Sequence, residues 1–332
     1  MAKNLPGVFI TDCEGPVTKN DNAAELAEAF IPRGDVFFAK LSLYDDYLAE
    51  VARKPGYKAG DTLRLLIPFL KAFGLDNNSM MKFSRRNIQI IPDADETLRQ
   101  IMALAPAYIV STSYSPYIMA VCDAIGFPFL NTFSTAVNLD KHFLSGKEKE
   151  ILRSFHRRIL ALPTFSIPAS TRQEDLDHDA QAAIREMDKI FWQELPKLDI
   201  YRLAQEVNPV GGYEKAAAVD RIVASLGLSL DTVLYVGDSI TDVQVFRKVR
   251  NGNGFAVSFN GNDWAVNEAS YAVTARTALP LRWLAEIFFT RGRDALEDLL
   301  MTHISQENRA QVSELSCRVR KSVRSEKIGA LG

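Results

Sequence analysis

Short apolar runs that end in polar or acidic residues constrain the fold of this chain most strongly. The run at 8–10 leads through Thr11 into Asp12, and the run at 232–236 leads through Gly237 into Asp238. Further runs of this kind lie at 107–110, 254–259 and 271–273. Their length and the turn residues that follow several of them predict buried β-strands.

Helical patterns separate most of these strands. They cover 94–104, 116–125 and 214–226, and the last two end at Gly126 and Gly227, a residue type suited to a helix C-terminus. Strands that alternate with helices predict a parallel sheet covered on both faces, which is a Rossmann-like α/β core. Ligands of such sheets bind at the carboxyl ends of the strands, where the polar residues of this chain lie.

Two long helical stretches interrupt the alternation and are predicted to be insertions that roof the ligand site. The predicted core consists of 1–15, 92–136 and 211–276. The other predicted parts are a helical cap at 16–91, a second helical insertion at 137–210 and a helical tail at 277–332. The end of the tail, 318–327, is basic and poor in large apolar residues, so we expect a solvated helix or partial disorder there.

The composition is that of an ordinary globular protein. The chain has 332 residues, a formal charge of −2 and three unclustered cysteines, which predict no attraction to nucleic acid, no disulfide framework and no thiolate metal site. The apolar runs are much shorter than the roughly 20 residues of a membrane span, and no signal region precedes the first strand. We therefore expect a cytoplasmic protein without a membrane span.

Six polar residues near the predicted strand ends and at the start of one helix are candidates for a catalytic site. They are Asp12, Glu14, Ser111, Lys215, Asp238 and Asp242. Each alone is ambiguous, because a strand-ending Asp is also common at turns and helix caps. Chance is a poor explanation for all of them in this order, and no glycine motif of the nucleotide-binding kind follows the first strand.

In this order the residues resemble the haloacid dehalogenase superfamily. The segment 12–15 stands where that family has its nucleophile loop, Ser111 stands at its second-strand hydroxyl, and Lys215 matches its lysine. Asp238 and Asp242 match its acidic pair. Glu14 and the stretch 109–140 are similar to phosphoserine-phosphatase-like members. The chain is more weakly similar to an archaeal branch known as energy-converting hydrogenase subunit R.

The resemblance implies a phosphatase that hydrolyses a small phosphorylated metabolite through an aspartyl-phosphate on Asp12. In the family pattern the metal is held by Asp12, the Glu14 carbonyl and Asp238, with Asp242 in a supporting role. Oxygen ligands of this kind suit Mg²⁺. The phosphate group would be bound by Ser111, Thr112 and Lys215.

Charge supports a role for the acidic residues beyond metal binding. Four carboxylates would repel a phosphomonoester dianion, so a divalent cation is required. Crowded carboxylates also raise one another's pKa, which favours a protonated Glu14 as the general acid and, after the first step, as the general base.

Other interpretations of the sequence stay open. The aspartyl-phosphate can be transferred to an acceptor alcohol in place of water, which would make the chain a phosphotransferase. The fold can also serve an accessory or interaction protein, associated with a hydrogenase, that binds a protein partner through 137–210 or the tail. In the cap, Arg33, Lys40 and Arg53 are candidates for substrate contact.

Overall fold

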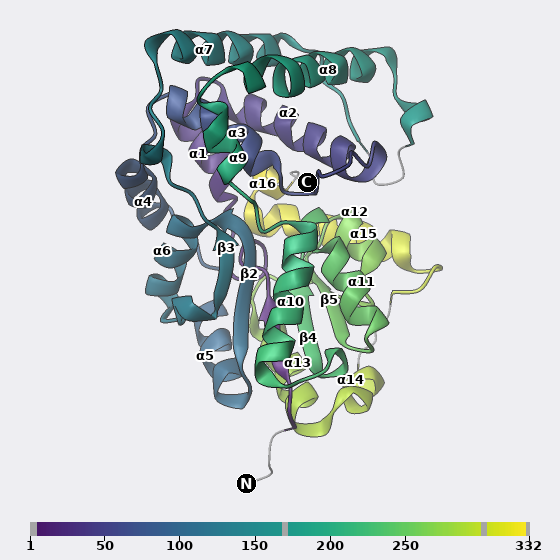
Figure 1. Cartoon of the computed structure of the whole chain (residues 1–332). Coiled ribbons are helices and arrows are strands. Elements are labelled where there is room, and N and C mark those ends of the chain that lie inside the picture. The colour runs from purple at the N-terminus through teal and green to yellow at the C-terminus, as the bar shows by residue number, and fades with distance from the viewer. Residues whose placement is uncertain (1–4, 168–171, 300–303, 330–332) are drawn as a thin grey trace.

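A fully parallel, six-stranded sheet forms the centre of the computed structural model, which describes residues 5–167, 172–299 and 304–329 (Figure 1). The strand order is β3-β2-β1-β4-β5-β6. The strands are β1 (Val8–Thr11), β2 (Ala107–Tyr114), β3 (Thr132–Thr135), β4 (Val233–Gly237), β5 (Phe255–Phe259) and β6 (Tyr271–Val273). The predicted Rossmann-like α/β fold is confirmed.

Helices cover both faces of the sheet. One apolar cluster joins the sheet to α5 (Ala94–Leu104), α6 (Ser115–Ile125) and α13 (Leu279–Arg291). The cluster on the opposite face joins it to α10 (Gly212–Leu226), α11 (Val243–Asn251) and α12 (Asp263–Glu268). Because β1 lies in the middle and is buried throughout, its carboxyl end is held between two neighbouring strands.

Two strands differ from the sequence-based prediction. β2 continues through Ser111 to Tyr114, because pairing with β3 resumes at Tyr114 after a shift in register that spans the polar residues. β3 was not predicted, since its sequence contains a single apolar residue, Phe133, and is only partly buried. Neither difference moves Ser111 away from the edge where β1 ends.

The two insertions pack together as one helical lobe above the sheet (Figure 1). The first contains α1 (Asn22–Phe30), α2 (Gly34–Asp46), α3 (Thr62–Ala72) and α4 (Asn77–Arg86). The second contains α7 (Gly146–Ala161), α8 (His178–Lys189) and α9 (Tyr201–Glu206). Phe69 of the first and Phe191 of the second lie 6.1 Å apart between ring centroids in one continuous apolar cluster.

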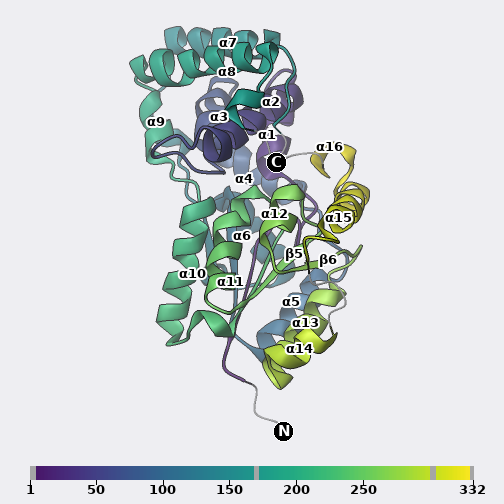
Figure 2. The same cartoon turned by 90° about the vertical axis from the view of Figure 1, so that its right-hand side faces the viewer.

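The tail returns to the junction between cap and core. It contains α14 (Arg293–Leu299), α15 (Arg309–Arg324) and α16 (Glu326–Gly329), and Figure 2 shows α15 and α16 at the level where the two lobes meet. Arg320 and Arg324 are buried, and Lys327 forms an ion pair with Glu28 of α1. The segment 318–327 is thus largely a solvated helix, as predicted, but the burial of Arg320 and Arg324 on one of its faces was not predicted. Residues 300–303 and 330–332 lie outside the described residues.

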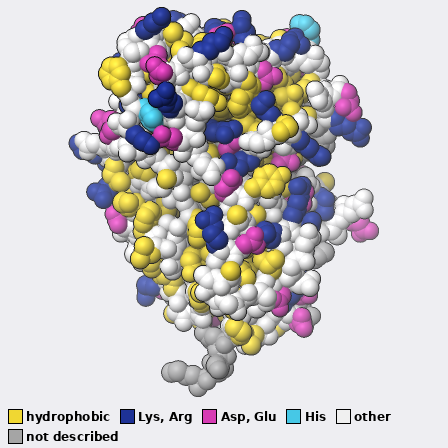
Figure 3. All heavy atoms as spheres, viewed as in Figure 1, with side chains coloured by type: hydrophobic (Ala, Val, Ile, Leu, Met, Phe, Trp, Pro, Cys, Tyr) yellow, Lys and Arg dark blue, Asp and Glu magenta, His cyan; other side chains and the backbone are white. Residues whose placement is uncertain are grey.

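The surface carries charges of both signs. On the face seen in Figure 3, Lys and Arg side chains are interspersed with Asp and Glu over both lobes. Among the helices of the described ranges, none combines the length and the apolar character needed to cross a membrane.

Candidate active site

Asp12 is the first residue beyond β1, at the centre of the sheet. Its backbone N–H donates to the Val236 carbonyl of β4 at 2.9 Å, and its Oδ1 accepts a hydrogen bond from the Cys13 N–H at 2.6 Å. The side chain is buried but lines a cavity at the strand ends. Burial raises the pKa of the Asp12 carboxyl to about 7, against the opposing charge of Lys215.

Lys215 lies in the first turn of α10 and bridges two of the predicted carboxylates. Its Nζ donates to Asp12 Oδ2 at 2.5 Å and to Asp242 Oδ1 at 2.8 Å, and all three side chains are buried. Burial alone would lower the pKa of Lys215, but the charges of Asp12 and Asp242 raise it above its ordinary value. Lys215 is therefore held as an ammonium directly behind Asp12.

Asp242 has hydrogen bonds to both carboxylate oxygens. Oδ1 also accepts the Tyr235 hydroxyl at 2.5 Å, while Oδ2 accepts the backbone N–H groups of Asp238 and Ser239 at 2.9 and 3.1 Å. Gly237 is required at the strand end, because a Cβ there would lie 2.4 Å from the Asp242 carboxyl carbon. Asp242 thus shapes the loop after β4 and orients Lys215.

Asp238 reaches across that loop toward the end of β1. A Cβ on Gly15, where φ is +103°, would lie only 2.2 Å from Asp238 Oδ2, so only glycine allows this approach. The same Oδ2 accepts hydrogen bonds from Arg320 and, at 2.9 Å, from Arg324 Nη1, both of α15. The carboxylate is 1% exposed and carries two buried cationic partners.

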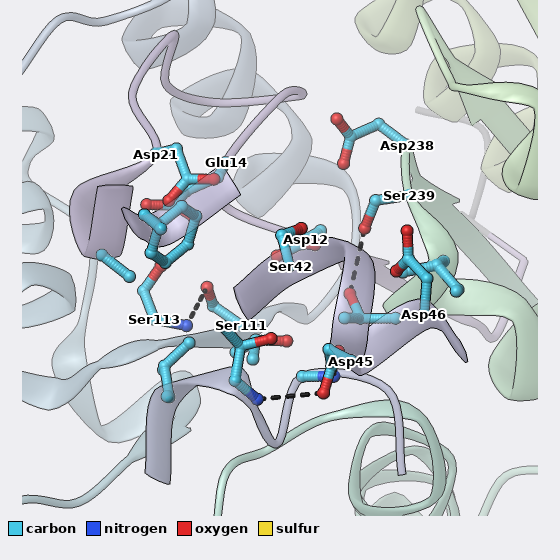
Figure 4. A pocket seen from close by; sticks show the side chains of 18 of the residues that line it. Asp12, Glu14, Asp21, Ser42, Asp45, Asp46, Ser111, Ser113, Asp238 and Ser239 are labelled. Atoms are coloured by element: carbon cyan, nitrogen blue, oxygen red, sulfur yellow. Dashed lines mark hydrogen bonds between the residues drawn. The ribbon is translucent and has the colours of Figure 1, made fainter. Parts of the chain in front are cut away.

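A cavity of about 100 Å³ lies between this edge and the cap (Figure 4). The core contributes Asp12, Glu14, Asp238 and the serine–threonine run of β2, including Ser111 and Thr112. The cap contributes polar side chains of α2 and of the first residue of α3, namely Ser42, Asp45, Asp46 and Thr62. Both lobes therefore enclose the place where a substrate would meet Asp12.

The predicted phosphate-binding residues are not equivalent in the structure. Ser111 and Thr112 line the cavity, although the Thr112 hydroxyl donates to the Val210 carbonyl at 3.0 Å. Lys215 lies behind Asp12 and is not one of the lining residues. Asp12 therefore lies between Lys215 and the cavity, and the lysine charge would attract a phosphoryl group across Asp12 without direct contact.

Glu14 lies apart from Asp12, beside Asp21 at the start of the cap (Figure 4). Its Oε1 accepts the Asn22 backbone N–H at 2.6 Å. Burial, followed by the charge of Asp21, raises the pKa of Glu14 well above its ordinary value. The raised pKa favours a protonated carboxyl, but the side chain lies on the Asp21 side of the cavity, so the role of Glu14 as general acid stays a prediction.

The oxygen donors fit a divalent cation. Carboxylate oxygens of Asp12, Asp238 and Asp242 lie within 4.8 Å of one another, and all three residues are buried. The Glu14 carboxylate is not part of this cluster in the described chain, and the predicted role of its backbone carbonyl stays a prediction. The donor chemistry suits Mg²⁺, and the existing hydrogen bonds of Asp242 favour its predicted supporting role.

The cationic candidates of the cap lie outside the site. Lys40 is buried and donates to the carbonyls of Ile159, Leu160 and Leu162 at the end of α7, so its predicted substrate contact is wrong. Arg33 and Arg53 adopt left-handed backbone conformations next to α2, and neither lines the cavity. The lysine instead joins the two insertions.

Sequence reasoning missed the two arginines of α15. The available signal was their spacing: Arg320 and Arg324 are four residues apart, which places both on one face of a helix. A basic helix with few large apolar residues usually indicates a solvated segment, and this hid the signal. Sequence reasoning also missed the hydrogen bond of Tyr235 to Asp242, because a tyrosine within an apolar strand looks like an ordinary core residue.

The fold and the site define a class of protein. A parallel sheet with a helical cap, and with acidic residues at the ends of β1 and β4, has the fold of solved phosphoserine phosphatases. A phosphoserine phosphatase with a phospho-aspartyl intermediate analogue shares this fold at 12% identity, with a TM-score of 0.51 over 83% of this chain and 97% of that chain. A substrate-bound phosphoserine phosphatase does so at 11% identity and a TM-score of 0.51, over 83% and 96%.

A more similar structure is that of gene product AF1437 from Archaeoglobus fulgidus. It is 31% identical, with a TM-score of 0.85, over 98% of this chain and 99% of that chain, and the chain belongs to the family of that protein. No protein-family model and no curated protein matches the chain. Since the relative is named only as a gene product, the resemblance to hydrogenase subunit R stays a prediction.

Proposed function

We propose that the chain is a magnesium-dependent phosphatase that hydrolyses a small phosphomonoester through a covalent aspartyl-phosphate. The observation that carries this proposal is the position of Asp12. Its carboxylate lies at the end of the central strand, lines the cavity, and is backed by the Lys215 ammonium at 2.5 Å. A carboxylate with a fixed cation behind it and open space before it is arranged to attack an electrophile.

In the first step, an Asp12 carboxylate oxygen forms a bond to phosphorus while the bond from phosphorus to the ester oxygen breaks. Glu14 donates its proton to that leaving oxygen. In the second step, Glu14 accepts a proton from water as the water attacks phosphorus, and the Asp12 carboxylate is released with inorganic phosphate. The raised pKa of Glu14 matches this alternation between acid and base.

Lys215 and Ser111 support the charge that develops during transfer. Lys215 offsets negative charge on Asp12, and Ser111, buried beside it in β2, offers a hydroxyl to the transferring oxygens. A bound Mg²⁺ held by Asp12, Asp238 and the Glu14 carbonyl would supply a Lewis acid that reduces repulsion between the carboxylates and the phosphate.

The size of the cavity favours a small substrate. About 100 Å³ is well below the 300–1,000 Å³ typical of sites for drug-sized ligands. The cap side of the cavity combines polar Ser42, Asp46 and Thr62 with apolar Ala23, Phe38 and Leu63, which favours a small substrate whose organic part has both polar and apolar groups.

A phosphatase screen tests this function directly. The purified chain is assayed with sugar phosphates, phosphoserine and nucleotides, with Mg²⁺ and with a chelator, by release of inorganic phosphate. We expect Mg²⁺-dependent turnover of at least one small ester and its loss in Asp12→Asn, which keeps the side-chain size. Asp231→Asn, at an exposed position before β4, is the matched control and should retain turnover.

Two results would contradict the proposal. Turnover retained by Asp12→Asn would remove Asp12 as the nucleophile. No turnover of any ester would favour the accessory or interaction protein that the sequence leaves open.

A further inference from the structure

The C-terminal helix α15 places two arginines in the candidate active site. Arg320 and Arg324 are 3% and 7% exposed, both line the cavity, and both pair with the Asp238 carboxylate. Arg324 also donates to the backbone carbonyls of Lys19 and Asn20, in the loop between β1 and α1. This helix is therefore tied to the metal-ligand residue and to the entrance of the cap.

Arg320 is less completely satisfied than Arg324. Its Nη1 donates to the Asp238 side chain and backbone carbonyl, but its buried Nε has no hydrogen-bond partner among the described residues. A guanidinium with an unused donor that also lines the cavity retains capacity to interact with an anion.

The arginines change the charge balance of the site. Among the groups joined by ion pairs, Asp12, Asp238 and Asp242 contribute three negative charges, and Lys215, Arg320 and Arg324 contribute three positive ones. The carboxyl groups of Glu14, Asp21, Asp45 and Asp46 also line the cavity and lie outside this ion-paired cluster. A divalent cation and a phosphomonoester dianion then enter a balanced cluster and cancel one another. Without the two arginines, the same cluster would hold two uncompensated negative charges facing the substrate.

We infer that Arg320 and Arg324 form a fixed cationic pair that favours the phosphate dianion at the expense of affinity for the divalent cation. This inference rests on the proposed phosphoryl chemistry of the same site. The pair weakens metal binding because it partly neutralises the Asp238 carboxylate. It strengthens anion binding because it adds positive potential to the cavity. Both arginines are positioning residues contributed by the tail.

The pair has a signature that a purely structural role would not produce. Removing a buried positive charge beside a carboxylate ligand strengthens the attraction of that ligand for Mg²⁺ and weakens the attraction of the cavity for an anion. A structural role predicts that both affinities fall together, because a displaced Asp238 would serve neither ligand.

Two binding measurements on the full chain test the inference without any assay of turnover. Mg²⁺ is titrated calorimetrically in the absence of phosphate, and inorganic phosphate is titrated in the presence of a chelator. For Arg320→Gln we expect the Kd of Mg²⁺ to fall roughly tenfold and the Kd of phosphate to rise roughly tenfold, the order expected for one charge at short range in a partly buried site.

Two further variants serve as controls. Arg318→Gln lies on the same helix, and its 71%-exposed side chain pairs only with Glu314 among the ion pairs of the described residues, so it should change neither Kd. Arg320→Lys keeps the charge and should leave both values within about threefold of the wild type. If Arg320→Gln does not fold, Arg320→Lys decides, because a larger change in either Kd contradicts a role based on charge.

Three outcomes would overturn the inference. They are unchanged affinities in Arg320→Gln, affinities that weaken together, and no phosphate binding by the metal-free wild type. Failure of the proposed function is recognised separately, since opposite shifts in the two Kd values can occur in a protein that turns over no ester.

Discussion

The acidic cluster has two sides that differ in the origin of their cations. On one side, Asp12 and Asp242 share Lys215 of α10, a helix of the core. On the other side, Asp238 is paired with Arg320 and Arg324 of α15, which belongs to the tail. The cations that pair with the acidic cluster thus come from two regions of the chain that are more than 100 residues apart in sequence.

The two sides therefore have different proposed roles: the lysine side supports the reaction, and the arginine side sets the relative affinity for metal and anion. The lysine side belongs to the strand-end pattern that the sequence predicts, and it surrounds the proposed nucleophile. The arginine side depends on a helix that follows the last strand of the sheet and packs on α12 through Ser313 and Asp263. Changes on the lysine side should affect folding and turnover, and changes on the arginine side should affect the balance between metal and anion.

The largest effect is expected from Lys215→Met. This change leaves Asp12 and Asp242 buried without their shared cation, which should lower the free energy of unfolding by about 3–5 kcal/mol at neutral pH. Chemical denaturation monitored by circular dichroism measures it. Lys248→Met, which removes a partly exposed pair with Asp220, should cost no more than about 1 kcal/mol; similar losses in the two variants would contradict a special role for the buried lysine.

A smaller effect is expected when the metal is supplied. Mg²⁺ at about 100 times its Kd should stabilise the wild type by roughly 2.7 kcal/mol, because it binds only the folded state. Asp238→Asn should lose this gain. Thermal melts with Mg²⁺ and with a chelator make the comparison, and a full Mg²⁺ response in the variant would exclude Asp238 as a ligand.

The pH dependence of stability should report on Asp12. Because burial raises the pKa of Asp12 to about 7 from an ordinary value of 3.8, the folded chain holds its proton over a range in which the unfolded chain has lost it. In a chelator, this contribution to stability should therefore decline as the pH rises from about 4 to about 7, by at most about 1.4 kcal/mol per pH unit. Denaturation at several pH values should show a flatter profile for Asp12→Asn; an unchanged profile would contradict the assignment.

The smallest effect is expected from Tyr235→Phe. The change removes one hydrogen bond to Asp242 on the lysine side, at a cost of about 0.5–1.5 kcal/mol in the free energy of unfolding. Mg²⁺ affinity should stay at the wild-type value, since Asp238 and its arginines are untouched. A change in Mg²⁺ affinity comparable to that of Arg320→Gln would show that the two sides are coupled.

The sequence predicted the acidic edge of the sheet well because local patterns specify it. β1 and β4 are each an apolar run that ends in polar residues, and the carboxyl ends of neighbouring parallel strands meet at one edge of the sheet. The start of α10 lies at the same edge. Asp12, Lys215, Asp238 and Asp242 do meet there. The boundaries of α5 also agree with the predicted range 94–104.

The cap and the tail were predicted less well because their positions depend on packing partners. Lys40 carries the positive charge expected of a residue that binds a phosphorylated substrate, but it is buried and donates to carbonyls at the end of α7. Arg320 and Arg324 lie in a segment whose basic composition resembles a solvated helix, and only the approach of α15 to Asp238 makes them part of the site.

The sequence by itself therefore determined the parallel core and the residues at its strand ends, because periodicity and turn chemistry act over a few neighbouring residues. Only the tertiary structure decided that the two insertions form one lobe and that the tail supplies two cations to the acidic cluster. Those arrangements depend on contacts between segments far apart in the chain. An arginine that is buried because it pairs with a carboxylate far away in the sequence leaves no pattern in the residues next to it.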